Sequence, residues 1–259
     1  MSNALHVVVT GASSGIGEAL VREYVKAGAK VTMLARRQEK MEAIAKDVGG
    51  TTQIFAWDLS NVETCCGWIE PAEEAFGPID ILINNAGAQI VAQVIDTEPA
   101  NAQRMMDLDL MVPLRLIQDI LPKMVERNRG SLINISSLAG LAPTPGMFYY
   151  SAAKAGLGAA SESLRGELRK TKINVLTVYP GPVDTPMART AIEKIGDSGA
   201  VSMMAQGTTD VLAKWIRKAN EKGRGRIIYP RVYGIVRHFP NLTRWAMDRF
   251  TPIPKKLPS

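Results

Sequence analysis

A tyrosine and a lysine four residues apart form the pair with the clearest chemical potential. Tyr150-Ser-Ala-Ala-Lys154 lies in a stretch with a helical pattern, and side chains at positions i and i+4 share one helix face. An isolated Tyr has a pKa of about 10, but a nearby ammonium favours the phenolate and lowers that pKa. Tyr150 can then exchange a proton with a substrate hydroxyl or carbonyl. Tyr149 has Ala153 at i+4, so it lacks this partner.

A glycine-rich segment follows the first predicted strand and opens the first predicted helix. Its residues 10–17 are Thr-Gly-Ala-Ser-Ser-Gly-Ile-Gly. The glycines permit a tight turn and a close approach to a diphosphate, and the helix N-terminus presents free N–H groups. A glycine loop alone is weak evidence, but the strand before it and the helix after it favour a dinucleotide site. The contacts expected from this loop are Gly11, Ser13, Ser14, Gly15, Ile16 and Gly17.

The end of the second predicted strand bears on the choice of cofactor. Dinucleotide folds place an acid here to bind the ribose hydroxyls of NAD, or a basic residue to bind the 2′-phosphate of NADP. This chain has Ala35 followed by Arg36 and Arg37. The planar guanidinium of Arg36 suits a phosphate. The sequence therefore favours NADP(H) over NAD(H); the alternative is that both arginines are solvated residues at the start of a helix.

Two further segments follow predicted strands. Asp58 comes after the third strand, where it either accepts a hydrogen bond from the adenine amino group or caps a turn. Asn84-Asn85-Ala86-Gly87 ends the fourth strand, and its small residues and amides suit close contact between backbone and cofactor. As an isolated motif this segment indicates only a turn.

Short apolar runs alternate with longer helical patterns along the chain. The runs are continuously apolar, as expected for strands covered on both faces. The predicted strands are His6–Thr10, Lys30–Ala35, Gln53–Trp57, Asp80–Asn84, Ser131–Ser136, Ile173–Tyr179 and Arg226–Tyr229. The predicted helices are Ile16–Ala27, Gln38–Val48, Val62–Phe76, Asn101–Arg127, Ser151–Lys170 and Ser202–Lys222.

This alternation predicts an α/β fold, a single doubly wound Rossmann-type domain with helices on both faces of a parallel sheet. The expected strand order is 3-2-1-4-5-6-7. Residues 1–229 form the dinucleotide-binding and catalytic part, and residues 230–259 a C-terminal extension of the same domain, expected as an irregular cap. Residues 182–200 lack a clear strand and are expected to form a loop or lid.

Composition excludes several classes of protein. The chain has 259 residues, 46% hydrophobic and 22% charged, which is ordinary for a globular protein. The net charge is +6, but no nucleic-acid-binding module is present. The cysteines, Cys65 and Cys66, suggest ordinary thiols on a helix in a reducing compartment. No metal-ligand cluster, secretory signal or transmembrane run is evident, so no metal and a cytoplasmic location are expected.

The motifs taken together resemble those of the short-chain dehydrogenase/reductase family, in its single-domain form. They follow one another in the order expected for that family: the glycine motif, Asp58, Asn84-Asn85-Ala86-Gly87, Ser137, Tyr150 with Lys154, and Pro180-Gly181-Pro182-Val183-Asp184-Thr185. The resemblance is specific from about Val7 to Thr185 and weaker beyond.

The resemblance implies a role for each matching residue. Ser137 would bind the substrate oxygen with Ser136 beside it, and Tyr150 would be the acid/base. Lys154 would tune Tyr150 and hold the nicotinamide ribose, while Thr185 would contact the nicotinamide amide or the phosphates. The further cofactor contacts it implies are Arg36, Arg37, Asp58, Leu59, Asn85, Ala86, Gly87, Tyr150, Pro180, Gly181 and Val183.

The chain departs from the family pattern at one position. The family usually carries an Asn at a helix irregularity after the fourth strand, where it binds a water that links the Lys to solvent; Asp109 matches it here. A carboxylate close to Lys154 would raise the pKa of the Lys and offset its effect on Tyr150. We expect Asp109 within reach of a water that touches Lys154; the alternative is a one-residue offset that places Asp109 elsewhere.

The implied function is NADP(H)-dependent interconversion of a carbonyl and a secondary alcohol. The substrate should be largely apolar, since the expected pocket is lined by Gln89, Leu138, Ala139, Pro145, Phe148, Met187, Met203 and Met204. The family commonly pairs subunits through the helices that carry Asp109 and Tyr150, so a homodimer or homotetramer is expected.

Two other functions remain open at this point. One is a nucleotide-binding sensor or scaffold that has lost turnover, supported by Asp109 alone. The other is a membrane-peripheral lipid carbonyl reductase, supported by the basic and aromatic residues of 226–250. Packing of this segment over the pocket or a partner subunit is favoured over membrane contact, and nucleic acid is not expected as a partner.

Overall fold

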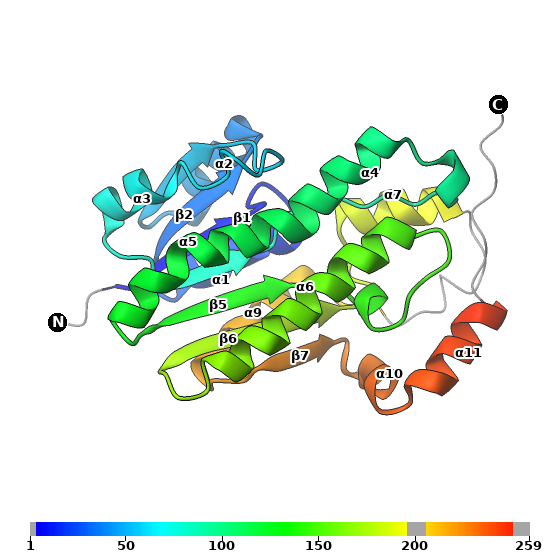
Figure 1. Cartoon of the computed structure of the whole chain (residues 1–259). Coiled ribbons are helices and arrows are strands. Elements are labelled where there is room, and N and C mark those ends of the chain that lie inside the picture. The colour runs from blue at the N-terminus through cyan, green and yellow to red at the C-terminus, as the bar shows by residue number, and fades with distance from the viewer. Residues whose placement is uncertain (1–3, 196–205, 251–259) are drawn as a thin grey trace.

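Seven parallel strands form one sheet in the order β3-β2-β1-β4-β5-β6-β7 (Figure 1). The computed structural model describes residues 4–195 and 206–250. The strand order and the parallel pairing confirm the sequence prediction. The strands are β1 His6–Thr10, β2 Lys30–Ala35, β3 Thr52–Ala56, β4 Ile81–Asn84, β5 Gly130–Ile135, β6 Ile173–Pro180 and β7 Arg226–Tyr229.

Helices cover both faces of the sheet (Figure 1). Successive residues of a strand point to opposite faces, so Val7 and Val9 of β1 join one core and Val8 joins the other. The first core packs against α1 Gly15–Lys26, α2 Gln38–Val48 and α9 Thr209–Glu221. The second packs against α3 Ile69–Phe76 and α5 Val112–Glu126, and α6 Phe148–Glu167 lies on the same face. Two covered faces explain the continuously apolar strands.

The helix that precedes β4 is shorter than the predicted Val62–Phe76: α3 begins only at Ile69. Two indole groups bind carbonyl oxygens in the turns before it. Trp57 Nε1 donates to the oxygen of Thr64 at 3.3 Å, and Trp68 Nε1 donates to the oxygen of Cys65 at 2.7 Å. These bonds satisfy acceptors that a longer helix would have used for its own backbone.

The helix predicted over Asn101–Arg127 contains an irregularity. It divides into α4 Pro99–Met106, the π-helical turn η2 Asp107–Met111, and α5. A π-turn adds a residue to one helical turn and often occurs at functional sites. The irregularity that the family resemblance implied near Asp109 is therefore present, and Asp109 lies within it.

Helices also occupy segments for which irregular structure was expected. Within residues 182–195, α7 spans Pro186–Ile195, and its start is capped because the Thr185 hydroxyl accepts from Ala188 N at 3.1 Å. After β7, the 3-10 turn η4 Arg231–Gly234 leads into α10 Ile235–His238 and α11 Pro240–Phe250. The expectation of an irregular cap is wrong over this range, since proline at the first helical position favours a helix.

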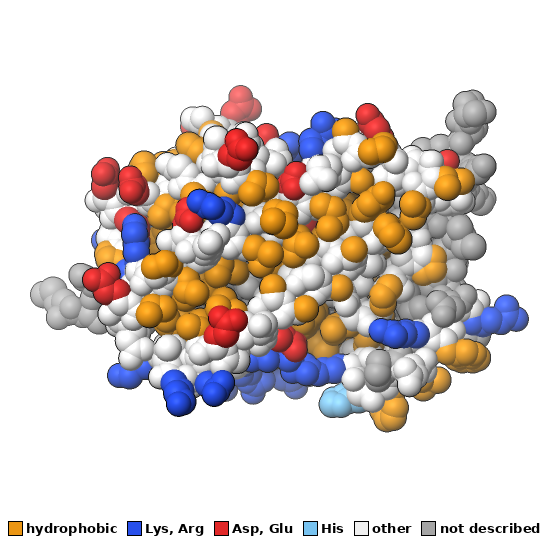
Figure 2. All heavy atoms as spheres, viewed as in Figure 1, with side chains coloured by type: hydrophobic (Ala, Val, Ile, Leu, Met, Phe, Trp, Pro, Cys, Tyr) orange, Lys and Arg blue, Asp and Glu red, His pale blue; other side chains and the backbone are white. Residues whose placement is uncertain are grey.

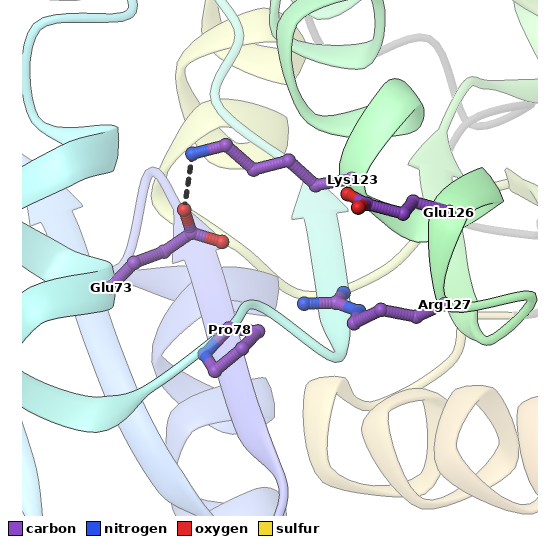
Figure 3. A pocket seen from close by; sticks show the side chains of 5 residues that line it. All are labelled: Glu73, Pro78, Lys123, Glu126 and Arg127. Atoms are coloured by element: carbon purple, nitrogen blue, oxygen red, sulfur yellow. Dashed lines mark hydrogen bonds and ion pairs between the residues drawn. The ribbon is translucent and has the colours of Figure 1, made fainter.

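The carboxyl ends of β1, β4, β5 and β6 meet at one edge of the sheet. The chain leaves β1 toward β2 on one side, while β4 lies on the other, so the strand order reverses between β1 and β4. Ligands of open α/β sheets bind at such a reversal point. A separate hollow lies at the opposite edge, where Pro78 precedes β4 and Glu73 pairs with Lys123 (Figure 3). The predicted site belongs to the carboxyl edge.

Candidate active site

The glycine-rich segment packs tightly against the turn that follows β4. Gly11 has a φ of 67° and Gly15 a φ of 59°, a left-handed conformation that favours glycine. A Cβ on Gly17 would lie 2.2 Å from the oxygen of Gly11 and 2.6 Å from Nδ2 of Asn85. Glycine at position 17 therefore lets the start of α1 pack closely against Gly11 and Asn85. The N-terminus of a helix that follows such a glycine segment is where a diphosphate would bind.

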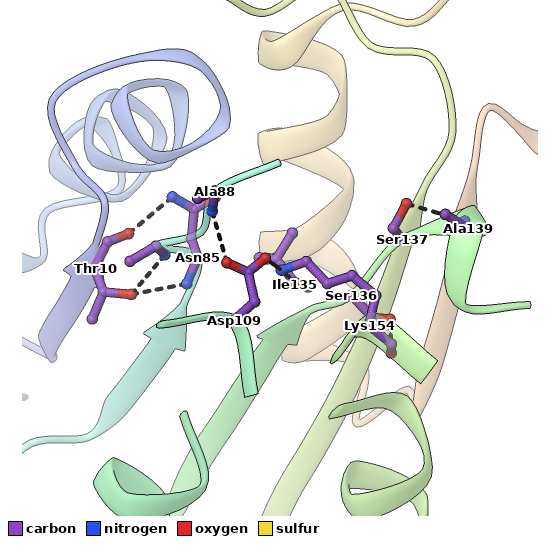
Figure 4. A network of polar contacts seen from close by, with 10 residues as sticks. Thr10, Asn85, Ala88, Asp109, Ile135, Ser136, Ser137, Ala139 and Lys154 are labelled. Carbon is purple, nitrogen blue, oxygen red and sulfur yellow. Dashed lines mark hydrogen bonds and ion pairs between the residues drawn. The ribbon is translucent and has the colours of Figure 1, made fainter. Parts of the chain in front are cut away.

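Thr10 joins the end of β1 to the segment after β4. Its hydroxyl accepts from the backbone N–H groups of Asn85 and Ala86, each at 2.9 Å, and donates to the oxygen of Ile83 at 3.2 Å. Asn85 Nδ2 also donates to the backbone oxygen of Thr10 at 2.9 Å (Figure 4). The two predicted cofactor segments thus form one hydrogen-bonded unit.

Arg37 reaches the glycine-rich segment, although Arg36 was expected to be the phosphate ligand. Arg37 donates from Nε and Nη2 to the Ser13 hydroxyl at 3.1 and 2.8 Å, and from Nη2 to the Ser14 hydroxyl at 2.8 Å. The charge of Arg36 instead acts on Asp58, whose pKa is lowered first by the N–H of Ser60 and also by Arg36.

Asp58 accepts from Ser60 N at 2.9 Å, so it caps a turn, which is one of the two alternatives left open by the sequence. Its side chain is exposed, and a turn cap does not prevent a further hydrogen bond to a ligand. Leu59 beside it is buried in the core. The structure therefore gives Leu59 a packing role.

The loop after β6 brings the predicted nicotinamide contacts toward the glycine-rich segment. Val183 bridges Gly207, and this pairing holds the loop in place. A Cβ on Gly15 would lie 3.4 Å from Cγ2 of Thr185. A Cβ on Gly181 would lie 2.6 Å from the Leu138 side chain and 3.1 Å from the Tyr233 ring. Gly181 thus connects this loop both to the segment after β5 and to the C-terminal extension.

A buried ion pair lies between these segments. Lys154 Nζ is 3.1 Å from Asp109 Oδ2, and the two side chains are 6% and 0% exposed. Asp109 Oδ1 accepts from Ala88 N at 2.7 Å, and Lys154 Nζ donates to the oxygen of Ile135 at 3.2 Å (Figure 4). Asp109 therefore contacts Lys154 directly, as a carboxylate that pairs with the Lys would, and a water within reach of both side chains stays a prediction.

Tyr150 and Ser137 lie next to this pair. Lys154 Nζ is 5.8 Å from the centre of the Tyr150 ring, and the Ser136 hydroxyl donates to the backbone oxygen of Lys154 at 2.7 Å. Burial raises the pKa of Tyr150, Lys154 lowers it, Asp109 raises it, and a hydrogen bond with Ser137 lowers it, with burial the strongest influence. The phenol is therefore held in its neutral form.

The ammonium and the carboxylate each have a shifted pKa. Burial lowers the pKa of Lys154, but Asp109 and then Tyr150 raise it, and the net direction is upward. Burial raises the pKa of Asp109, against the opposing influences of Lys154 and the N–H of Ala88. The raised pKa of Lys154 agrees with the effect that the sequence predicted for a carboxylate at this position.

A family model described as "short chain dehydrogenase" matches residues 5–196 of the chain. The chain belongs to the short-chain dehydrogenase/reductase family. An uncharacterised oxidoreductase of Staphylococcus aureus is 36% identical over 179 residues, which cover 69% of this chain and 78% of that protein. The chain is thus an oxidoreductase of this family.

Solved structures of family members share the fold. A short-chain dehydrogenase from Streptomyces avermitilis aligns with a TM-score of 0.78 and 28% identity, covering 94% of this chain and 99% of that one. A metagenomic short-chain oxidoreductase in complex with NADP aligns with a TM-score of 0.73 and 29% identity, covering 88% of this chain and 97% of that one.

The apolar residues that surround Tyr150 differ in part from those predicted to line the substrate pocket. Tyr150 and Ala139 pack with Met105, which the sequence analysis missed because it lies at helical spacing like any core residue. Phe148, expected in the pocket, is 60% exposed. Met147 also joins this cluster, and its sulfur lies 3.5 Å from the Gln89 amide. Met203 and Met204 lie outside the described residues.

The close packing of Gly17 against Gly11 can be tested by its effect on stability. Gly17→Ala should lower the free energy of unfolding by about 1–3 kcal/mol, because the new methyl group overlaps the oxygen of Gly11. Gly166→Ala in α6 is the matched control, since an added Cβ there meets nothing within 4 Å. The control should gain about 0.5–1 kcal/mol from the better helix former. Urea unfolding measures both, and equal stabilities for Gly17→Ala and the wild type would contradict the packing.

Proposed function

We propose that this dehydrogenase/reductase interconverts an apolar carbonyl compound and a secondary alcohol with NADP(H). The observation that carries the proposal is the buried Tyr150 phenol, held between Ser137 and Lys154 at the carboxyl edge of the sheet. The apolar cluster of Met105, Ala139 and Tyr150 supports an apolar substrate.

The residues at the end of β1 fit a dinucleotide. Gly11 and Gly17 leave no room for side chains, and the Ser14 side chain does not cap the N–H groups at the start of α1, which can therefore bind a diphosphate. Arg37 lies over the hydroxyls of Ser13 and Ser14, and Arg36 precedes it. Two cations and no carboxylate at the end of β2 support binding of a 2′-phosphate. The solved complex of a family member with NADP supports the same choice.

The side chains divide the chemistry between them. A reduced nicotinamide supplies the hydride when bound. Tyr150 donates its phenolic proton to the carbonyl oxygen in reduction and accepts it back in oxidation. Ser137 orients the same oxygen by a hydrogen bond, and Lys154 stabilises the phenolate that forms. Asp109 keeps Lys154 charged and keeps Tyr150 protonated before the reaction.

A sensor without turnover is the competing hypothesis, because a carboxylate replaces the usual amide at position 109. The intact Ser137, Tyr150 and Lys154 favour an enzyme. A panel of apolar ketones, aldehydes and alcohols, followed by the absorbance of the reduced cofactor, separates the two hypotheses. Turnover of any member of the panel excludes the sensor.

We also propose that the chain forms a homo-oligomer. Hydrophobic side chains gather over α5 and α6 on the face shown in Figure 2. Met111 of η2 and Val125 of α5 are 45% and 47% exposed. Exposed apolar patches of this kind support subunit contact.

The arginines after β2 generate a prediction of cofactor preference. NADPH should bind about ten- to a hundred-fold more tightly than NADH, because a charge-assisted phosphate contact stabilises by about 1.5–3 kcal/mol. The double variant Arg36→Ala/Arg37→Ala should lose most of this difference, and the single variants apportion it. Lys40→Ala, an exposed cation of α2, is the control. Calorimetry gives the dissociation constants, and equal values for the two cofactors in the wild type would refute the preference.

The two adjacent tyrosines provide a matched pair of variants. Tyr150→Phe removes the phenolic proton and keeps the ring, so turnover should fall by at least about a hundred-fold while cofactor binding survives. Tyr149→Phe should lose far less, since Ala153 and not Lys154 lies four residues on. Steady-state rates with one substrate of the panel make the comparison. A dead Tyr149→Phe beside an active Tyr150→Phe would show that the site is assigned wrongly.

The ion pair of Asp109 and Lys154 generates a prediction of pH dependence. Asp109→Asn removes the charge that raises the pKa of Tyr150, so the apparent pKa of the Tyr150 step should fall. Reduction needs the protonated phenol, so its rate should be lost at lower pH in the variant than in the wild type. Asp107→Asn, two residues away, is the control. A pH–rate profile measures the shift, and a rise in the apparent pKa would contradict the electrostatic argument.

A further inference from the structure

An exposed apolar stripe runs along the segment after β7. Its members lie three or four residues apart along η4, α10 and α11, and the chain bends at Phe239, whose φ of −129° and ψ of 62° are not helical. They are Val232, Ile235, Phe239, Leu242 and Trp245, exposed by 63%, 56%, 57%, 58% and 60%. We call them the C-terminal stripe. Within α10, Val236 is buried, at 8% exposed, and packs against the domain.

Backbone hydrogen bonds connect the two helices that carry most of the stripe. Phe239 N donates to the oxygen of Ile235 at 2.9 Å, and Thr243 N donates to the oxygen of Phe239 at 3.0 Å. These bonds connect α10 to α11 across Pro240. The stripe is therefore a surface of defined shape, larger than the isolated exposed residues that any protein carries.

The net charge of the protein is concentrated in the same segment. Residues 230–259 contain six Lys and Arg residues and one Asp, so they carry +5 of the net +6. Residues 1–229 are left with a net charge of only +1. Arg237, Arg244 and Arg249 are exposed beside the stripe. Blue and orange side chains lie together over α10 and α11 at the lower right of Figure 2.

We propose that the C-terminal stripe and its arginines dock onto the surface of an anionic phospholipid bilayer. The apolar side chains enter the boundary between headgroups and acyl chains, and the guanidinium groups bind lipid phosphates. No helix within residues 4–195 and 206–250 is long and apolar enough to cross a membrane. Docking is therefore peripheral, with α10 and α11 lying in the plane of the surface.

Charge decides between a bilayer and a second copy of this chain. Self-association through the stripe would bring two segments of charge +5 together, and residues 1–229, with a net charge of +1, carry no net negative charge to offset it. An anionic surface instead complements both the apolar stripe and its basic border. Each basic residue near such a surface adds to the binding, and salt screens this contribution.

Co-sedimentation of the full chain with large unilamellar vesicles tests the proposal. Vesicles of equal parts phosphatidylglycerol and phosphatidylcholine should bind at least about tenfold more protein than pure phosphatidylcholine vesicles, and 0.5 M salt should remove most of the difference. Equal binding to both vesicles, or binding to neither, would overturn the proposal.

Matched variants separate the apolar and charged contributions. Phe239→Ser/Leu242→Ser and Arg244→Glu/Arg249→Glu should each weaken binding to the anionic vesicles by at least about tenfold. Val94→Ser/Ile95→Ser removes exposed apolar groups elsewhere, and Lys170→Glu/Lys172→Glu makes the same charge change at the amino edge of the sheet. Both controls should bind as the wild type does. Controls that weaken binding as much as the stripe variants would overturn the assignment of the surface.

Two further measurements keep the result interpretable. Circular dichroism and thermal unfolding should be unchanged in the stripe variants, because the substituted side chains are exposed. Sedimentation velocity without lipid tests the second-copy alternative. An oligomer that Phe239→Ser/Leu242→Ser dissociates, in a protein that does not bind anionic vesicles, would assign the stripe to a subunit interface.

Discussion

The ion pair between Asp109 and Lys154 connects the parts of the site that the chain brings from distant positions. Asp109 stands on η2, Lys154 on α6, and their remaining polar atoms bind the backbone of Ala88 and Ile135. The segments of Ala88 and Ile135, at the carboxyl edge of the sheet, are thus both held against one charged pair. Removing one partner of such a buried pair leaves an uncompensated charge, at a cost of about 3–5 kcal/mol. Each member of the pair therefore offsets the cost of burying the charge of the other.

The same pair limits what can stand next to it. A Cβ on Gly87 would lie 3.0 Å from Asp109 Oδ2 and 3.3 Å from Lys154 Nζ. The glycine after Asn85 and Ala86 is thus favoured by its close packing against the pair, independently of any contact with a cofactor. Gly87 was predicted as a cofactor contact, and its packing against the ion pair is a second reason for a glycine at this position. Close packing of charged and small residues also keeps water away, which strengthens the electrostatic influence of Lys154 on Tyr150.

Strand order and most strand bounds were predictable because a parallel sheet buries both faces and leaves continuous apolar runs such as Val7–Val9. The start of α3 was not predictable, since it depends on indole groups of Trp57 and Trp68 that bind nearby carbonyl oxygens. The π-turn at Asp109 has no signature in helical periodicity, and only the family resemblance indicated it. The helices of residues 231–250 were missed because they are short and are separated at Phe239, where the backbone angles are not helical.

Of the candidate site, the residues that share a local motif were predictable, and their partners across the fold were not. Tyr150 and Lys154 follow from spacing along one helix. The contacts of Arg37 with Ser13 and Ser14, and of Met105 with Tyr150, join residues far apart in sequence. The contact of Tyr233 with Gly181 was not predictable for the same reason. Through that contact the C-terminal extension packs against the loop after β6, so the basic, apolar surface of the molecule begins beside the residues expected to hold the nicotinamide.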